Sequence, residues 1–179
     1  MTEENKAHGL YRPETEHDAC GVGIVADILG RKSHRMIEMG LEVLDSLAHR
    51  GACGCDPKTG DGGGMILQMP HAFFKQRAAD VGIRLPEPGR YGVGMVFLPW
   101  EAEERAAYLS IVEQTIREEG QAFLGWRDVP VDDSGIGIIA QDSEPVIRQA
   151  FVGRNPSLPD QDAFARKLYV SRKGIERKV

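Results

Sequence analysis

The chain has 179 residues, of which 41% are hydrophobic and 27% charged, and its formal net charge is −5 at pH 7. This length allows one domain with a substantial core, and the composition is typical of a globular protein. The acidic balance argues against a nucleic-acid-binding surface, and no apolar run is long enough to span a membrane. Three cysteines, without an apolar signal segment in residues 1–19, favour a reducing, cytoplasmic location.

The first part of the chain predicts a strand followed by a helix. Residues 1–18 are polar and lack periodicity, which indicates a flexible leader. Residues 20–27 then run through glycine, valine and isoleucine, and this pattern predicts a strand buried on both faces. Ser33 is a candidate N-cap for a helix whose apolar residues recur at helical spacing as far as Ala48, and Gly51 is its candidate C-cap.

The rest of the chain alternates short strands and helices. A glycine-rich loop leads into the first of these elements, and proline and glycine residues separate the others. The predicted elements are a strand at 65–69, a helix at 71–79, a strand at 91–98, a helix at 100–119, a strand at 122–129, a turn at 132–135, a short apolar element at 136–140, a strand at 146–152 and a helix at 161–179.

Cys20 lies at the start of the first predicted strand, where a thiol is well placed to meet a substrate. Gly21 and Gly23 lack side chains, so another group can approach this backbone closely. Against this interpretation, cysteine is among the most often buried residues and is then usually inert. Position alone leaves both interpretations open.

Other motifs predict neither a metal site nor a nucleotide site. Cys53 and Cys55 do not have the spacing of common zinc ligands, and a second cysteine pair is absent. The glycines of residues 60–64 lack the Gly-Lys-Ser/Thr ending of a phosphate-binding loop, and residues 92–94 lack the third glycine of a dinucleotide-binding turn. We therefore expect no metal and no cofactor in this chain.

Several motifs follow one another at distances typical of one family. They are Gly9-Leu10-Tyr11, Glu16-His17-Asp18-Ala19-Cys20-Gly21-Val22-Gly23, His49-Arg50-Gly51-Ala52, Thr59-Gly60-Asp61-Gly62, Ala72-Phe73-Phe74, Arg127-Asp128-Val129-Pro130-Val131, Glu144-Pro145, Ile147-Arg148-Gln149 and Arg166-Lys167-Leu168-Tyr169-Val170. Together they resemble the N-terminal class II glutamine amidotransferase domain of the glutamate synthase large (alpha) subunit. The resemblance covers nearly the whole chain.

The resemblance implies a fold and a processing step. The fold is α+β, the four-layer αββα sandwich of the N-terminal-nucleophile hydrolases, of which this chain would supply the N-terminal portion. Residues 1–19 would be a leader, or propeptide, that is cleaved off, and residues 20–179 would belong to the amidotransferase domain. Cys20 would then be the first residue and the nucleophile.

This placement agrees with the chemistry of the two groups on Cys20. A thiol with a pKa of about 8.5 is only slightly ionised at neutral pH. A free α-amine, with a pKa of about 7.7–8.0, can act as a base there, whereas an amide nitrogen cannot. Cleavage before Cys20 would therefore put base and nucleophile in one residue, and we expect the chain that retains Met1 to be weakly active or inactive.

Arg50 and Gly51 are the candidate substrate-binding residues. A guanidinium group binds a carboxylate in a bidentate manner, and free glutamine carries one. In the resembled family the His-Arg-Gly turn lies beside the nucleophile. The alternative for Arg50 is a side chain that satisfies carbonyl groups at the end of the helix, and the alternative for Gly51 is a helix cap.

The resemblance also implies a reaction and its partners. Cys20 would attack L-glutamine, release ammonia and form a γ-glutamyl thioester that water converts to glutamate. The ammonia would serve glutamate synthesis from 2-oxoglutarate in further domains of the large subunit, which carry FMN and an iron–sulfur cluster. Electrons would come through a small reductase subunit or from ferredoxin. The setting would be nitrogen assimilation in the cytoplasm.

Part of the family's site has no counterpart in this sequence. The family takes its oxyanion donors from an Asn-Gly pair, whereas Asn5 and Asn155 are followed by lysine and proline. We therefore expect an incomplete fragment that is weak or inactive alone. Two alternatives stay open: another class II amidotransferase, of the phosphoribosyl-pyrophosphate type, or a catalytically dead fragment that acts only as an interaction module.

Overall fold

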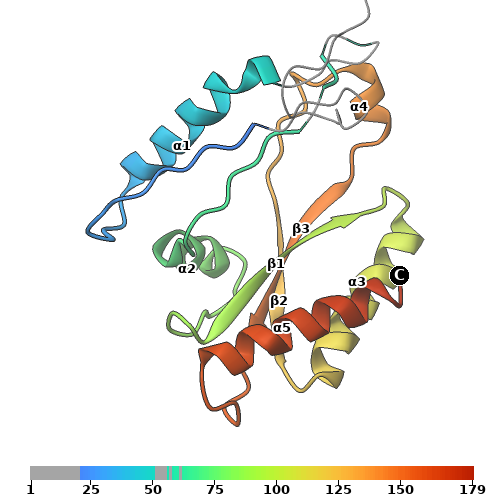
Figure 1. Cartoon of the computed structure of the whole chain (residues 1–179). Helices are drawn as coiled ribbons and strands as arrows, with labels where there is room; N and C mark the ends of the chain where they lie inside the picture. Colours follow the sequence, from blue (N-terminus) through green and yellow to red (C-terminus); the bar gives the residue numbers. More distant parts are fainter. Residues whose placement is uncertain (1–20, 51–55, 57, 61) are drawn as a thin grey trace, which may run out of the picture. The chain divides into compact units, whose positions relative to one another are not determined.

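A computed structural model describes residues 21–50, 56, 58–60 and 62–179. The chain divides into two compact units, Met1–Leu67 with Ile136–Ile139 and Gln68–Gly135 with Ala140–Val179. The elements, labelled in Figure 1, are α1 (His34–Ser46), the 3₁₀ helix η2 (Ala48–Arg50), α2 (His71–Ala79), β1 (Tyr91–Leu98), α3 (Ala102–Glu118), β2 (Ala122–Asp128), α4 (Ile138–Asp142), β3 (Val146–Gly153) and α5 (Gln161–Glu176).

The second unit is built on an antiparallel sheet in the order β1-β3-β2. Tyr91 of β1 and Ala122 of β2 both lie opposite Gly153 of the central strand. The register of β2 shifts between Phe123 and Gly125, which forms a bulge. Gly125 has a φ of 146°, and a β-carbon there would lie 2.8 Å from the Ile83 side chain, so glycine suits both the backbone and the packing.

Alternate residues of β3 enter two cores on opposite faces of the sheet. Ala150 and Val152 pack with Val112 and Ile116 of α3, and α5 adds partly buried apolar side chains to this cluster. Phe151, which is fully buried, packs on the other face with residues of and after α2. The period of two along β3 is therefore what divides the hydrophobic residues between the faces.

Helices α3 and α5 lie side by side over one face of this sheet (Figure 1). A β-carbon on Gly174 would lie 3.1 Å from Cγ2 of Thr115, so the two helices approach closely at this glycine. The N-terminus of α5 is capped by Asp160, whose Oδ1 accepts a hydrogen bond of 2.7 Å from the N–H of Ala163.

Most of the predicted elements of the second unit are confirmed. The helix at 71–79 and the strand at 91–98 have the expected bounds, and the helices at 100–119 and 161–179 are present but shorter. The strands at 122–129 and 146–152 are confirmed with small shifts of their ends. The short apolar element at 136–140, most of which belongs to the first unit, is a helix, α4, that begins at Ile138. The described residues combine helices with a small antiparallel sheet, as the predicted α+β class requires, and the four-layer sandwich stays a prediction.

The two strands predicted at 20–27 and 65–69 are wrong for the residues described. Residues 21–27 and 65–69 have no strand structure, because neither segment pairs with a described strand. Val22 and Ile24 are 83% and 89% exposed, so the prediction of burial on both faces also fails. The sequence pattern indicates apolar extended segments, but a strand also needs a neighbour that supplies hydrogen bonds.

The predicted helix of the first unit is present but ends early. Ser33 is at the N-cap position of α1, as expected, although its side chain makes no capping hydrogen bond. The helix ends at Ser46 with Leu47 as its C-cap residue, so Gly51 does not cap it as predicted. Within the part of the chain that the structure describes, no helix is both long and apolar enough to cross a membrane.

Candidate functional site

Of the three predicted site residues, the structure describes only the backbone of Arg50. Cys20 and Gly51 lie outside the described residues. Arg50 is the last residue of η2, and its side chain is also outside the description. All three belong to the first unit, whose described residues include the segment after Cys20, helix α1 and the segments that follow Arg50.

The segment that follows Cys20 packs closely against α1. A β-carbon added to Gly23 would overlap Cγ1 of Val43, so glycine is what permits this approach. An open groove of about 300 Å³ lies along the contact. It is lined by Gly23, Val25, Met39, Glu42, Val43, Ser46 and Leu47. Helix α1 thus supports the backbone directly after the predicted nucleophile.

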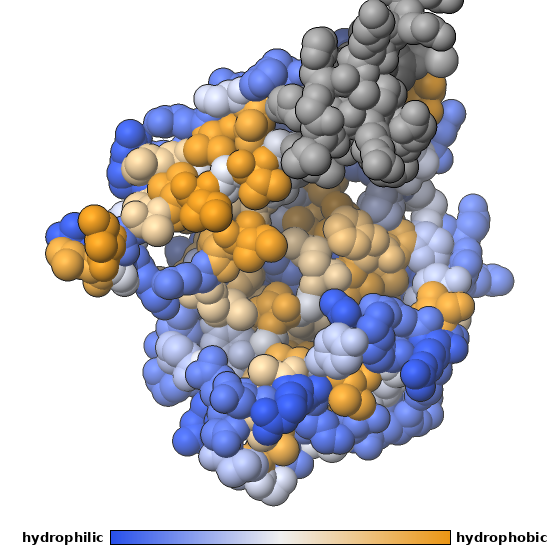
Figure 2. Space-filling view, in the orientation of Figure 1, coloured by the Kyte–Doolittle hydropathy of each residue, from blue (hydrophilic) through white to orange (hydrophobic). Residues whose placement is uncertain are grey.

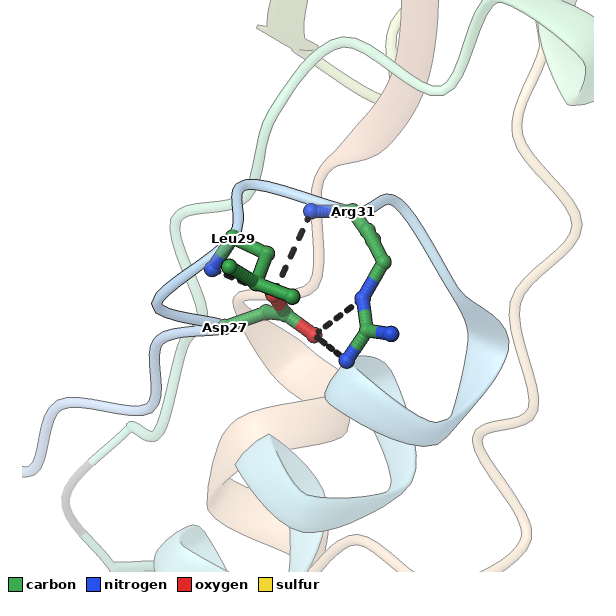
Figure 3. Close-up of polar contacts among 3 residues, drawn as sticks. All are labelled: Asp27, Leu29 and Arg31. Carbon is green, nitrogen blue, oxygen red and sulfur yellow. Dashed lines mark hydrogen bonds and ion pairs between the residues drawn. The ribbon is translucent and has the colours of Figure 1, made fainter.

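A polar turn ends this segment and directs the chain into α1 (Figure 3). Oδ1 of Asp27 accepts hydrogen bonds from the N–H groups of Leu29, at 2.8 Å, and Arg31, at 3.4 Å. Its Oδ2 accepts two from the Arg31 guanidinium group, at 3.2 and 3.1 Å. The guanidinium and the N–H groups hold the pKa of Asp27 below its usual value. Gly30, with a φ of 67°, completes the turn.

A histidine side chain contacts a backbone carbonyl group at the C-terminal end of α1. Nδ1 of His49 lies 2.9 Å from the carbonyl oxygen of Ser46, so a protonated Nδ1 donates to that oxygen. The predicted alternative role of Arg50 was to bind such carbonyl groups. For the carbonyl of Ser46, the neighbouring His49 fills this role.

A second polar cluster, the Asp56 cluster, joins two distant parts of the first unit. Asp56 accepts hydrogen bonds of 3.0 Å from the N–H of Lys58 and from Oγ1 of Thr59. The backbone N–H groups of Ile138 and Ile139 also bond to its carboxylate. These hydrogen bonds, led by that from Lys58, lower the pKa of Asp56.

Gly137 completes the Asp56 cluster. It is buried, and its N–H donates to the carbonyl oxygen of Lys58 at 3.2 Å. A β-carbon there would overlap Oδ2 of Asp56 and Oγ1 of Thr59. The sequence analysis did not identify this cluster. Aspartate before proline is a turn signal that could have indicated Asp56, but no local pattern points to its contact with Gly137.

A partly buried polar pair, His71 and Tyr91, lies in the second unit. The hydroxyl of Tyr91 lies 3.0 Å from Nδ1 of His71, and burial raises the pKa of Tyr91. Tyr91 also borders an open groove of about 240 Å³ between β1 and α5. Among the described residues, no group of three or more histidine, cysteine, aspartate or glutamate side chains could hold a metal ion. Cys53 and Cys55 lie outside that description.

Comparison with known protein families gives one match. The model of the class-II glutamine amidotransferases matches residues 20–179 of this chain. The match therefore includes both units and begins at the predicted nucleophile.

Known proteins similar to this chain carry related names. The NADPH glutamate synthase large chain of Bacillus subtilis (strain 168) is 49% identical over 171 residues, which are 96% of this chain and 11% of that protein. The large chain from Azospirillum brasilense is 41% identical over 94% of this chain and 11% of its own length. The ferredoxin-dependent glutamate synthase 2 of Synechocystis is 38% identical over 92% of this chain and 10% of its own length. The chain thus spans about a tenth of the length of these relatives.

Proposed function

The chain belongs to the class-II glutamine amidotransferases, and on that premise we propose that Cys20 is the nucleophile that removes ammonia from L-glutamine. The thiolate attacks the side-chain carbonyl carbon, the carbon–nitrogen bond breaks, and ammonia leaves with a proton. The γ-glutamyl thioester that results reacts with water, which regenerates the thiol and gives glutamate. Arg50 and Gly51 are proposed to bind the substrate beside Cys20.

One observation carries this proposal. The family match begins at Cys20 and leaves residues 1–19 outside it, which is the boundary expected if those residues are a removed leader. Removal would convert the amide nitrogen of Cys20 into an amine. The amine can accept the thiol proton at neutral pH, so the site needs no separate histidine base.

We propose the four-layer αββα sandwich as the complete fold. Apolar side chains that such a fold would bury are exposed in each unit, and Figure 2 shows hydrophobic surface on the face it presents. Ile24 and Ile66 of the first unit are 89% and 103% exposed, and Met95 and Phe97 of β1 are 53% and 64% exposed. In a sandwich, two sheets pack face to face about 10 Å apart and bury alternate residues of this kind between them.

The names of the relatives support glutamate synthase as the whole enzyme, in preference to the phosphoribosyl-pyrophosphate type of amidotransferase. The proposed larger reaction passes ammonia to 2-oxoglutarate in domains with FMN and an iron–sulfur cluster, and takes electrons through a reductase subunit or ferredoxin. Neither cofactor is assigned to residues of this chain. A cytoplasmic place in nitrogen assimilation follows from the same proposal.

The experiment is active-site labelling of the chain that begins at Cys20. A diazo-ketone analogue of glutamine should form one covalent adduct at Cys20, which peptide mass spectrometry locates, and glutamine should slow its formation. The adduct should be lost in Cys20→Ser and retained in the matched controls Cys53→Ser and Cys55→Ser. Labelling that persists in Cys20→Ser, or that glutamine does not slow, would refute the proposal.

A further inference from the structure

We propose that the outer edge of β1 is the docking site for a further strand, which pairs antiparallel to β1 and is supplied by polypeptide beyond α5. The sheet order is β1-β3-β2, so β3 pairs with one edge of β1, and no described strand pairs with the other. Unpaired backbone groups along such an edge are ready partners for another strand. Every residue that carries this inference belongs to the second unit, so it does not depend on Cys20.

The backbone groups on the outer edge of β1 belong to alternate residues. The N–H of Arg154 donates to the carbonyl oxygen of Arg90 at 2.8 Å, next to the first pair of the β1–β3 register. In an antiparallel ladder the hydrogen-bonded pairs recur at every second residue. The even-numbered residues of β1 therefore bond to β3, and the N–H and C=O groups of its odd-numbered residues face outward. The outward-facing residues are Tyr91, Val93, Met95 and Phe97.

The two edges of the sheet differ in how they are protected against further pairing. The edge strand β2 has a bulge between Phe123 and Gly125, and it carries the charged residues Arg127 and Asp128. Bulges and charges are the usual devices that keep an edge strand from pairing. The β1 sequence contains no charged residue and no proline, and its ladder with β3 is regular. An edge without such protection is the one that suits a further strand.

The open groove of about 240 Å³ between β1 and α5 lies along this edge. Tyr91 and Val93, whose backbone groups face outward, line the groove together with Phe164 and Leu168 of α5. Helix α5 approaches β1 closely at Gly92, where a β-carbon would lie 2.6 Å from Cδ1 of Leu168. The groove thus offers peptide groups on one side and apolar side chains on the other. An extended segment with apolar residues at alternate positions fits both.

The path of the chain directs a strand after α5 to this edge. Because β1 and β2 are both antiparallel to β3, they are parallel to each other, and α3 connects them across β3. Helix α5 follows β3 and covers the same face as α3. Crossovers between parallel strands are almost always right-handed. Since β3 runs opposite to β1, a right-handed crossover over this same face proceeds in the opposite direction, past β1 to its outer edge.

Hydrogen exchange of the 179-residue chain, followed by NMR, tests whether the edge is free. The amides of Val93 and Met95 should exchange faster than those of Gly94 and Val96 by on the order of tenfold or more, because only the latter donate to β3. The central strand β3 is the control, since it pairs on both edges and should show no such alternation. Equally slow exchange of both sets in β1 would overturn the inference.

The occupant is tested in the large chain of Bacillus subtilis, which is 49% identical to this chain over 171 residues. Exchange measured by mass spectrometry with fragmentation to single residues should be slower at the amides that align with Val93 and Met95, by on the order of tenfold or more. Exchange there as fast as in the 179-residue chain would overturn the proposed strand.

Sedimentation velocity of the 179-residue chain separates this occupant from a second copy. We expect a monomer in which the amides of Val93 and Met95 exchange fast. A dimer in which these two amides are slow would assign the edge to a second copy and overturn the proposed strand. Neither exchange nor sedimentation depends on the reactivity of Cys20, so failure of the proposed function is read separately from failure of this inference.

Discussion

Gly137 occupies a position where a β-carbon would overlap the carboxylate of Asp56, a residue from a distant part of the chain. Because Asp56 is held by hydrogen bonds from Lys58 and Thr59, it cannot turn aside without losing them. This contact shows how a turn after the predicted substrate-binding residues is joined to the segment before α4.

Gly137→Ala should destabilise the first unit by about 1–3 kcal/mol, the usual cost of an added methyl group in a filled site. Gly135→Ala is the matched control, since a β-carbon at that exposed glycine would meet no described atom within 4 Å. The control should be neutral or stabilising by up to about 1 kcal/mol. Urea unfolding measures both changes. Equal stability of the two variants would show that the crowding around Gly137 has no energetic effect.

Gly23→Ala should also destabilise the first unit, because its β-carbon would overlap Cγ1 of Val43 on α1. Val43→Ala removes that atom, so the double variant should lose less stability than the sum of the single ones, with a coupling of about 0.5–3 kcal/mol. Gly64→Ala, at an open position, serves as the control. Additive effects in the double-mutant cycle would contradict the packing of this segment on α1.

Arg31→Gln should raise the pKa of Asp27 toward its ordinary value, because the guanidinium is the largest cause of its lowering. The lowered pKa means that Asp27 stabilises the turn above the unfolded-state value of about 3.9, and that this stabilisation is lost as pH falls through the lower folded-state pKa. Carbon-13 NMR titration of the carboxyl group measures the shift. Arg35→Gln is the control, since Arg35 pairs with Glu38 and Glu42. An unchanged pKa in Arg31→Gln would refute the assignment.

Local sequence patterns were sufficient for elements whose partners lie in the described second unit. Proline and glycine boundaries located β1, α2 and α3, and Tyr91, Ala78 and the pair Val112 and Ile116 anchor these elements in cores that are present. The apolar segments at 21–27 and 65–69 have equally clear patterns, yet they form no strand among the described residues. These patterns show that both segments favour strand structure, but a strand also needs a partner strand from elsewhere in the chain.

The candidate site was predicted only where chemistry or family resemblance pointed to single residues. The thiol of Cys20 and the guanidinium of Arg50 suggested roles by their functional groups, and those roles stay predictions because the structure does not describe these side chains. Asp56 and Gly137 act through a contact between distant segments, which neither periodicity nor local spacing encodes. The bulge at Gly125 was missed for a similar reason, because this glycine packs against Ile83, which lies far from it in the sequence.

The most direct test of the central claim compares Cys20 in two forms of the chain, one that begins at Cys20 and one that retains Met1. The measurement is the rate at which the diazo-ketone glutamine analogue labels Cys20 at pH 7. If the free α-amine is the base, the chain that begins at Cys20 should react faster by on the order of a hundredfold or more. Equal rates in the two forms would contradict the claim that exposing the amine of Cys20 creates the catalyst.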